Sequence, residues 1–124
     1  MNSKFIGTGS YIPSKIKKNS DFINHLFLDT DGNQILSKNE SVIQKLEAIT
    51  GIKERKYVTD NLISSDIAAE ASRNAIKSSS IDPETIDYII LAHNVGDVTH
   101  GSSQIDAMPS LASRVKSKLG IKNP

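Results

Sequence analysis

Cysteine and tryptophan are both absent from this chain of 124 residues. Without cysteine the chain can form no disulfide, no thiolate metal site and no cysteine nucleophile of its own. An excess of one charge is also lacking, because 15 Lys and Arg face 14 Asp and Glu, for a net charge of +1. We therefore expect neither nucleic acid nor an anionic membrane as a partner. No apolar run could cross a bilayer and no signal-peptide core follows the N-terminus, which predicts a cytoplasmic protein.

The composition fits one globular domain, with 37% hydrophobic and 23% charged residues. Two segments have the pattern of β-strands. Residues 4–10 run into a turn that ends at Pro13, and Gly7 and Gly9 allow close backbone packing. A dinucleotide-binding fingerprint is disfavoured there because its third glycine is missing. Residues 86–92 are almost continuously apolar, which is typical of a strand covered on both faces in a parallel sheet.

Helical patterns lie between and after these segments. We expect helical turns at 19–25 and 82–85, and longer helices that begin near Asn39, Ser64 and Pro109. Asn39 is the expected cap of the first long helix, with a capping box from Ser37 to Glu40 as the alternative, and Gly51 is expected to end it. The many alanines of the second predict close packing against a neighbour.

The last helix is expected to bury Met108, Leu111, Val115 and Leu119 and to stop at Gly120. The charged run 53–56 is interpreted as a solvated turn held by local ion pairs. Strands that alternate with helices predict an α/β domain with a parallel sheet. Because two strands make a poor sheet, the chain has the pattern of the beginning of a larger protein.

Residues 26–40 have two interpretations. From Asp29 to Glu40, oxygen-bearing side chains occupy positions 1, 3, 5, 9 and 12 of an EF-hand calcium loop, but the glycine required at position 6 is replaced by Gln34. The alternative, which we favour, is a β-hairpin that joins 26–28 to 35–36 through a turn at 31–33.

Five stretches, in order and in register, resemble β-ketoacyl-ACP synthase III and its relatives in the thiolase superfamily. They are 6–13, 49–55 (the family's Thr-Gly-Ile-basic-Glu-Arg segment), 65–68, 81–90 and 108–124. The resemblance implies a five-layered αβαβα fold built from two similar halves. Residues 1–124 would be the N-terminal part of the first half, with an incomplete parallel or mixed sheet and a hairpin-like insert at about 26–40.

The resemblance also implies the chemistry of the longer enzyme, an acyltransferase that needs no cofactor and no metal. A cysteine thiolate takes an acyl group from acyl-CoA or acyl-ACP, and a His and Asn pair then supports decarboxylative condensation with malonyl-ACP. All three catalytic residues would lie beyond Pro124, and His25, His93 and His100 do not match the family's histidine. We therefore expect the chain alone to be inactive.

Three residues match substrate-binding positions of the family, which works as a homodimer. Met108 corresponds to a side chain at the end of the partner subunit's acyl tunnel, Asn94 to a position near the active-site cavity, and Thr50 to one near the CoA entrance. Each also has a purely structural interpretation: helix packing for Met108, turn polarity for Asn94 and the end of a helix for Thr50.

Two departures bear on the substrate. Lys45 and Ile49 replace the Trp and Arg with which an acetyl-CoA-using member grips adenine, which favours a carrier-bound or longer acyl donor. The insert after Phe27 should alter the tunnel entrance. The alternatives in a different class are a stand-alone domain that oligomerises through its unfinished sheet edge, and a calcium-binding module at 29–40.

Overall fold

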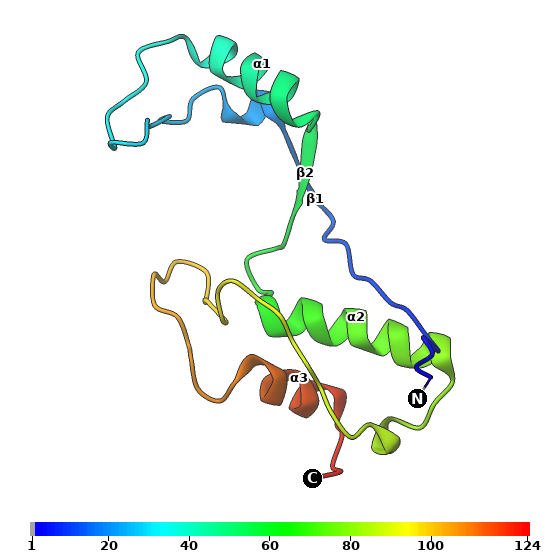
Figure 1. Cartoon of the computed structure of the whole chain (residues 1–124). Coiled ribbons are helices and arrows are strands. Elements are labelled where there is room, and N and C mark those ends of the chain that lie inside the picture. Colours follow the sequence, from blue (N-terminus) through cyan, green and yellow to red (C-terminus); the bar gives the residue numbers. More distant parts are fainter. Residues whose placement is uncertain (1) are drawn as a thin grey trace. The chain divides into compact units, whose positions relative to one another are not determined.

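The structure, a computed structural model, describes residues 2–124 as two compact units. The small unit is Pro13–Tyr57, and the large unit joins the segment up to Ile12 to Val58–Pro124. The small unit contains β1 (Lys15–Lys18), the 3₁₀ turn η1 (Asn19–Phe22), α1 (Asn39–Thr50) and β2 (Glu54–Tyr57), and the large unit contains α2 (Ser64–Ser79), the 3₁₀ turn η2 (Pro83–Thr85) and α3 (Leu111–Leu119) (Figure 1). Within residues 2–124, no helix combines the length and the apolar character that crossing a membrane requires.

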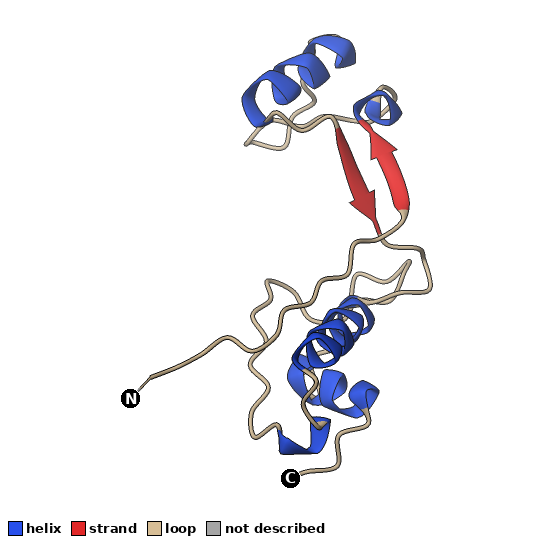
Figure 2. Cartoon of the chain, turned by 90° about the vertical axis from the view of Figure 1, so that its right-hand side faces the viewer, coloured by secondary structure: helices blue, strands red, loops and turns tan. Residues whose placement is uncertain are grey.

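The small unit is built on a two-stranded antiparallel sheet, drawn in red in Figure 2. In its register Lys15 faces Tyr57 and Lys18 faces Glu54, so one cross-strand pair joins opposite charges. The expected turn at 53–56 is therefore mostly a strand, although the expected local ion pair is present between Glu54 and Lys56 at 3.6 Å. The charged run hid this strand because both of its faces are largely exposed.

The hairpin interpretation of 26–40 is confirmed. Leu28 and Gln34 form an antiparallel bridge, and the backbone N–H of Ile35 donates to the carbonyl of Phe27 at 2.9 Å. Oδ1 of Asp29 accepts the N–H groups of Asp31 and Asn33 at 2.9 and 2.8 Å, so this carboxylate closes the turn. No cluster of three or more His, Asp or Glu residues in the described chain is arranged to hold a metal ion.

The start of α1 differs from the expectation, whereas its end agrees. Asn39 is the first helical residue and Lys38 precedes it, with no side-chain cap. The amide Nδ2 of Asn39 donates instead to the carbonyls of Ile23 and His25, at 2.6 and 2.9 Å. The prediction of an Asn39 cap is therefore wrong, because a contact with a distant segment uses that side chain. Gly51 ends the helix with φ of 67°, as expected.

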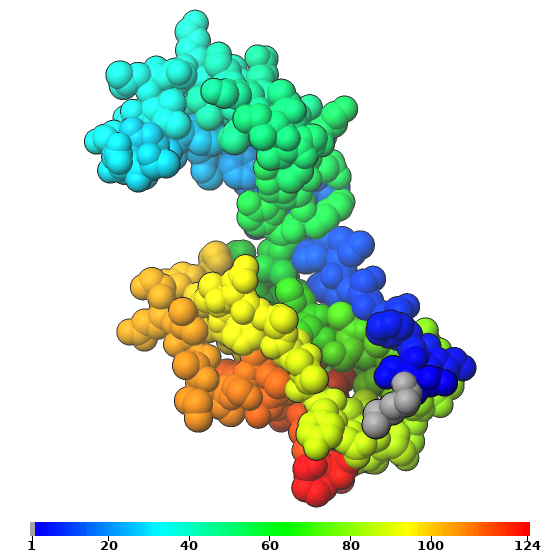
Figure 3. Space-filling model, viewed as in Figure 1, coloured from blue at the N-terminus to red at the C-terminus, as the bar shows by residue number. Residues whose placement is uncertain are grey.

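The large unit holds the buried apolar residues of the described chain, which are Ala69, Leu111, Val115 and Ile121. They come from α2, from α3 and from the residue that follows the Gly120 cap. The N-terminal segment lies against α2 (Figure 3, dark blue beside green). A Cβ at Gly9 would lie 2.2 Å from the backbone N of Ala75 and 2.3 Å from the carbonyl of Ala71, so the predicted close packing is confirmed.

Neither of the two expected strands is present in the described chain: 4–10 and 86–92 are irregular segments. Tyr88 and Ile90 are 86% and 93% exposed, so the apolar run is uncovered here. A strand requires a neighbouring ladder for its N–H and C=O groups, and no partner strand lies beside either segment within residues 2–124. The sheet that is present is antiparallel, not parallel.

The last helix begins at Leu111, after its Ser110 cap, and ends at Gly120. Leu111 and Val115 are buried as predicted, whereas Met108 is 79% exposed. The prediction that Met108 packs with the helix stripe is therefore wrong. Met108 precedes the helix, so the spacing of three and four residues does not apply to it.

Candidate functional site

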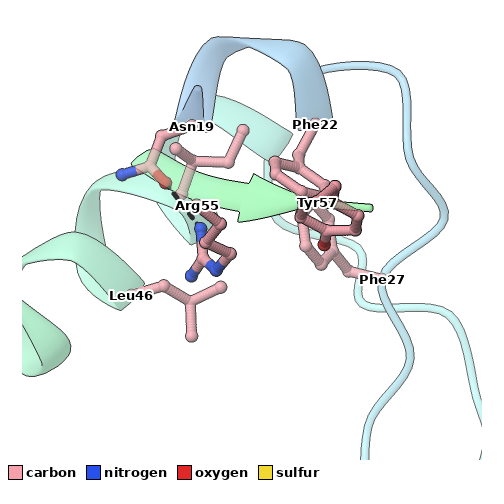
Figure 4. Close-up of a pocket in the computed structure, with 7 residues that line it drawn as sticks. Asn19, Phe22, Phe27, Leu46, Arg55 and Tyr57 are labelled. Atoms are coloured by element: carbon pink, nitrogen blue, oxygen red, sulfur yellow. Dashed lines mark hydrogen bonds between the residues drawn. The ribbon is translucent and has the colours of Figure 1, made fainter. Parts of the chain in front are cut away.

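The small unit contains a pocket of about 200 Å³ beside its sheet (Figure 4). Its walls come from η1, α1, β2 and the hairpin segment: Asn19, Phe22, Phe27, Ile43, Leu46, Arg55 and Tyr57. These side chains include three aromatic rings, two aliphatic groups, one amide and one guanidinium. Most of this lining is apolar, so the pocket is suited to binding an apolar group.

Asn19 joins the elements around this pocket. Its Nδ2 donates to Oε2 of Glu47 and to the carbonyl of Ile52, both at 2.8 Å. Its Oδ1 accepts a hydrogen bond from Nη1 of Arg55 at 2.9 Å, drawn dashed in Figure 4. One amide at the start of η1 thus joins α1 to β2, and it uses both its donor and its acceptor to do so.

Arg55 and Phe22 lie next to each other in the wall of the pocket. The guanidinium carbon of Arg55 lies 5.6 Å from the centroid of the Phe22 ring, within cation–π range. His25 packs on Phe22 with ring centroids 4.9 Å apart. Sequence analysis missed this arrangement, although Arg55 closes the Thr-Gly-Ile-basic-Glu-Arg segment and Phe22 lies in the expected helical turn.

Thr50 lies at the end of α1 in the small unit. Its hydroxyl donates to the carbonyl of Leu46 at 2.7 Å and accepts the N–H of Ile52 at 3.2 Å. This is the structural role that was the alternative for Thr50. Its role near a CoA entrance stays a prediction.

Asn94 and Met108 belong to the large unit, in the irregular chain between η2 and α3. Asn94 is exposed in a bend, and Met108 is exposed immediately before Pro109. Thr50 belongs to the small unit. Asn94 and Met108 stay predictions as substrate contacts.

A charged cluster that sequence analysis missed lies beside Met108. Nη1 of Arg114 lies 3.5 Å from Oδ2 of the buried Asp97, and Nη2 lies 2.8 Å from Oδ2 of Asp106. Oδ1 of Asp97 accepts the N–H of Ser65 at 2.8 Å, at the first turn of α2. Asp97 and Asp106 lie in an irregular loop that has no hydrophobic periodicity. The sequence pattern therefore could not predict that their carboxylates contact Arg114 of α3.

A second ion pair joins the two long helices of the large unit. Nζ of Lys118 lies 2.6 Å from Oδ1 of Asp66, and Oδ2 of Asp66 accepts the N–H of Ile63 at 3.1 Å. The hydrogen bond from Lys118 is the largest cause that holds the pKa of Asp66 below its ordinary value of 3.8, against the opposing effect of partial burial. This carboxylate fixes the start of α2, since it occupies the N3 position of the helix.

The histidines are not organised for catalysis. Nδ1 of His100 lies 3.7 Å from Oδ1 of Asp60, with both side chains exposed to solvent. His25 packs on a ring of the small unit, and the chain has no cysteine for a histidine to activate.

Comparison with known proteins identifies the class of the fold and then homologous sequences. A solved structure, 3-oxoacyl-(acyl carrier protein) synthase III, FabH, from Pseudomonas aeruginosa PAO1, superimposes with a TM-score of 0.65 and 25% identity over 95% of this chain and 29% of that chain. The fold is thus a partial α/β fold of the thiolase-like type. No protein-family model matches the chain.

Two curated relatives show what the chain is similar to in sequence. β-Ketoacyl-[acyl-carrier-protein] synthase III 1 of Vibrio vulnificus (strain YJ016) is 37% identical over 122 residues, which is 98% of this chain and 32% of the relative. β-Ketoacyl-[acyl-carrier-protein] synthase III of Clostridium acetobutylicum is 40% identical over 124 residues, 99% of this chain and 31% of the relative. The resemblance found in the sequence is confirmed: the chain is homologous to part of a β-ketoacyl-ACP synthase III and spans about a third of the length of these relatives.

Proposed function

We propose that this chain is the N-terminal part of a β-ketoacyl-ACP synthase III-type acyltransferase, in which it supplies acyl-pocket wall and dimer surface. The observation that carries the proposal is similarity along 98% of the chain to enzymes named for this activity. The substrates would be an acyl-CoA or acyl-ACP and malonyl-ACP, the working form a homodimer and the location the cytoplasm.

The chemistry of the reaction indicates which part of the enzyme would supply the catalytic residues. Acyl transfer needs a thiolate, and condensation needs donors for the developing enolate oxygen. This chain has no cysteine, so the nucleophile would come from the part of the enzyme that follows Pro124. The exposed Met108 is the residue we assign to the end of the partner's acyl tunnel, because a flexible thioether adapts to a variable apolar chain.

The test is a chimera in which residues 1–124 replace the matching segment of the Clostridium acetobutylicum relative, at 40% identity. We expect a folded dimer that condenses an acyl thioester with malonyl-ACP, whereas the 124-residue chain alone should form no product. A chimera that is folded and dimeric but inactive would contradict the proposal. If the chimera does not fold, an antibody against this chain should still detect a native product well above 13.5 kDa in the source cell, and a band at that mass would count against the proposal.

A second candidate function is self-association of the chain through uncovered apolar segments. Phe5, Tyr88 and Ile90 are each more than four-fifths exposed and lie in segments with no ladder partner within residues 2–124. Unpaired, apolar, extended chain favours pairing with another copy. Size-exclusion chromatography with light scattering distinguishes the candidates, because a stable monomer of the 124-residue chain would contradict self-association.

A further inference from the structure

Arg114 donates hydrogen bonds to the backbone of the loop that carries Met108. Its Nη2 donates to the carbonyl of Met108 at 2.7 Å, and its Nε donates to the carbonyl of Pro109 at 3.0 Å. The same guanidinium lies 2.8 Å from Oδ2 of Asp106 and 3.5 Å from Oδ2 of Asp97, an ion pair without a hydrogen bond, and its side chain is only 17% exposed. A planar fork of this kind fixes its acceptors in both distance and direction.

Arg114 and its partner Asp97 are themselves fixed to α3 and α2. Arg114 itself stands in the first turns of α3, one residue before the fully buried Val115. Asp97, 2% exposed, accepts the N–H of Ser65 at the start of α2. The backbone N–H of Asp106 also donates to the carbonyl of Asp97 at 2.9 Å. Both ends of the 97–106 loop are therefore tied to the α2–α3 core through Arg114.

The consequence for Met108 is a fixed backbone and a free side chain. Met108 is 79% exposed, so apolar packing does not determine its position. The bonds from Arg114 hold its carbonyl and that of the next residue. We propose that Arg114 is a positioning residue that sets where Met108 meets the acyl chain and thereby tunes acyl-chain preference. This inference rests on the proposed function, which gives Met108 its acyl contact.

The first experiment measures the hold on Met108 without any activity. The chain has two methionines, and Met1 carries an amine, so [¹⁵N]methionine labelling of the 124-residue protein gives one backbone amide signal, from Met108. Arg114→Lys keeps the charge beside Asp97 but loses the fork. Arg73→Lys is the matched control, because Arg73 also pairs with a carboxylate and donates to a backbone carbonyl, that of Lys118 at 2.7 Å.

We expect the Met108 amide to be ordered in the parent and in Arg73→Lys, with an order parameter of about 0.85, and to fall below about 0.6 in Arg114→Lys. An unchanged order parameter in a folded Arg114→Lys protein would overturn the inference. Should this variant not fold, Asp97→Asn combined with Arg114→Gln removes both charges together, and the same loss of order is expected there.

The second experiment uses the chimera and compares kcat/KM for acetyl and octanoyl donors. Met108→Ala should change the ratio by about tenfold, since a pocket wall is lost. Arg114→Lys should change it in the same direction and add little to Met108→Ala, as expected for residues that act through one contact. Equal losses for both donors in Arg114→Lys would mean a structural role only and would overturn the inference. If Met108→Ala leaves the ratio unchanged, the acyl role of Met108 in the proposed function fails, while the amide signal still decides whether Arg114 holds this loop.

Discussion

Replacing Arg114 by Gln should destabilise the large unit far more than replacing its buried partner Asp97 by Asn. The carboxylate of Asp97 is 3% exposed, and Arg114 is the one cationic side chain paired with it among residues 2–124. Without that guanidinium a buried charge is left uncompensated, which costs about 3–5 kcal/mol. Arg114, in contrast, keeps Asp106 and two backbone carbonyls as acceptors when Asp97 is neutral.

The unfolding free energies of the two single variants and the double variant form a double-mutant cycle in which the two single losses differ. Asp97→Asn retains an oxygen that can accept the N–H of Ser65, so we expect a loss of about 1–2 kcal/mol. The double variant should lie closer to Asp97→Asn than to Arg114→Gln, with a coupling of about 1–3 kcal/mol. Urea unfolding followed by helical circular dichroism measures each free energy, because α2 and α3 carry most of the helical signal of this unit.

The control is Arg73→Gln, which removes an equal charge from an exposed pair on α2 and should change stability by at most about 1 kcal/mol. A loss in Arg114→Gln no greater than that in Asp97→Asn would refute the reasoning, because it would mean that the buried carboxylate needs no cation. An Arg114→Gln protein that is unfolded in buffer but regains its helical signal with Asp97→Asn would support it.

Other predictions concern packing and pH. Gly9→Ala should free the N-terminal segment from α2, because the new Cβ would overlap the backbone of Ala75, 2.2 Å away; hydrogen exchange and proteolysis of residues 2–12 should rise, and unchanged protection would contradict the close approach. Val115→Ala should cost about 2 kcal/mol in urea unfolding, because this side chain is 0% exposed, and a loss under about 0.5 kcal/mol would contradict its place in the core. The pKa of Asp66 is depressed in the folded chain, so stabilisation by its pair with Lys118 is complete above the ordinary value of 3.8 and is lost as the pH falls through the folded value. When the pH is lowered from about 5 to about 2, the free energy of unfolding should therefore fall less for Asp66→Asn than for the parent. Equal losses of stability in the two proteins would count against the pair.

Features closed by local hydrogen bonds were predictable from the sequence. Gly51 and Gly120 end their helices in the left-handed conformation, and Asp82 caps η2 by accepting the N–H of Glu84 at 3.0 Å. The hairpin at 26–40 was found for the same reason, because its turn is closed within five residues by Asp29. In each case the partners are so near in sequence that residue type alone selects the geometry.

The candidate site was predicted only in part. The resemblance suggested Met108, Asn94 and Thr50 as substrate contacts, and these assignments stay predictions; the structure shows only that the side chain of Met108 is exposed. The bonds of Thr50 at the end of α1 are local and agree with the structural interpretation made from the sequence. The hydrogen bond from Arg114 to the carbonyl of Met108 was not predictable, because it depends on how the loop before α3 folds back onto the helix.

The sequence by itself indicated the similarity to β-ketoacyl-ACP synthase III, the positions of α1, α2 and α3, the glycines that end α1 and α3, and the absence of a thiol nucleophile among these residues. Tertiary structure decided that Asn39 holds the segment after η1 and does not cap its own helix. It also decided that 86–92 lies uncovered and that Asp97 meets Arg114. The physical reason is separation along the chain: a pattern of residue types reports the bonds a residue can make to near neighbours, whereas a strand, a buried charge or a distant amide contact requires a partner that only folding brings into range.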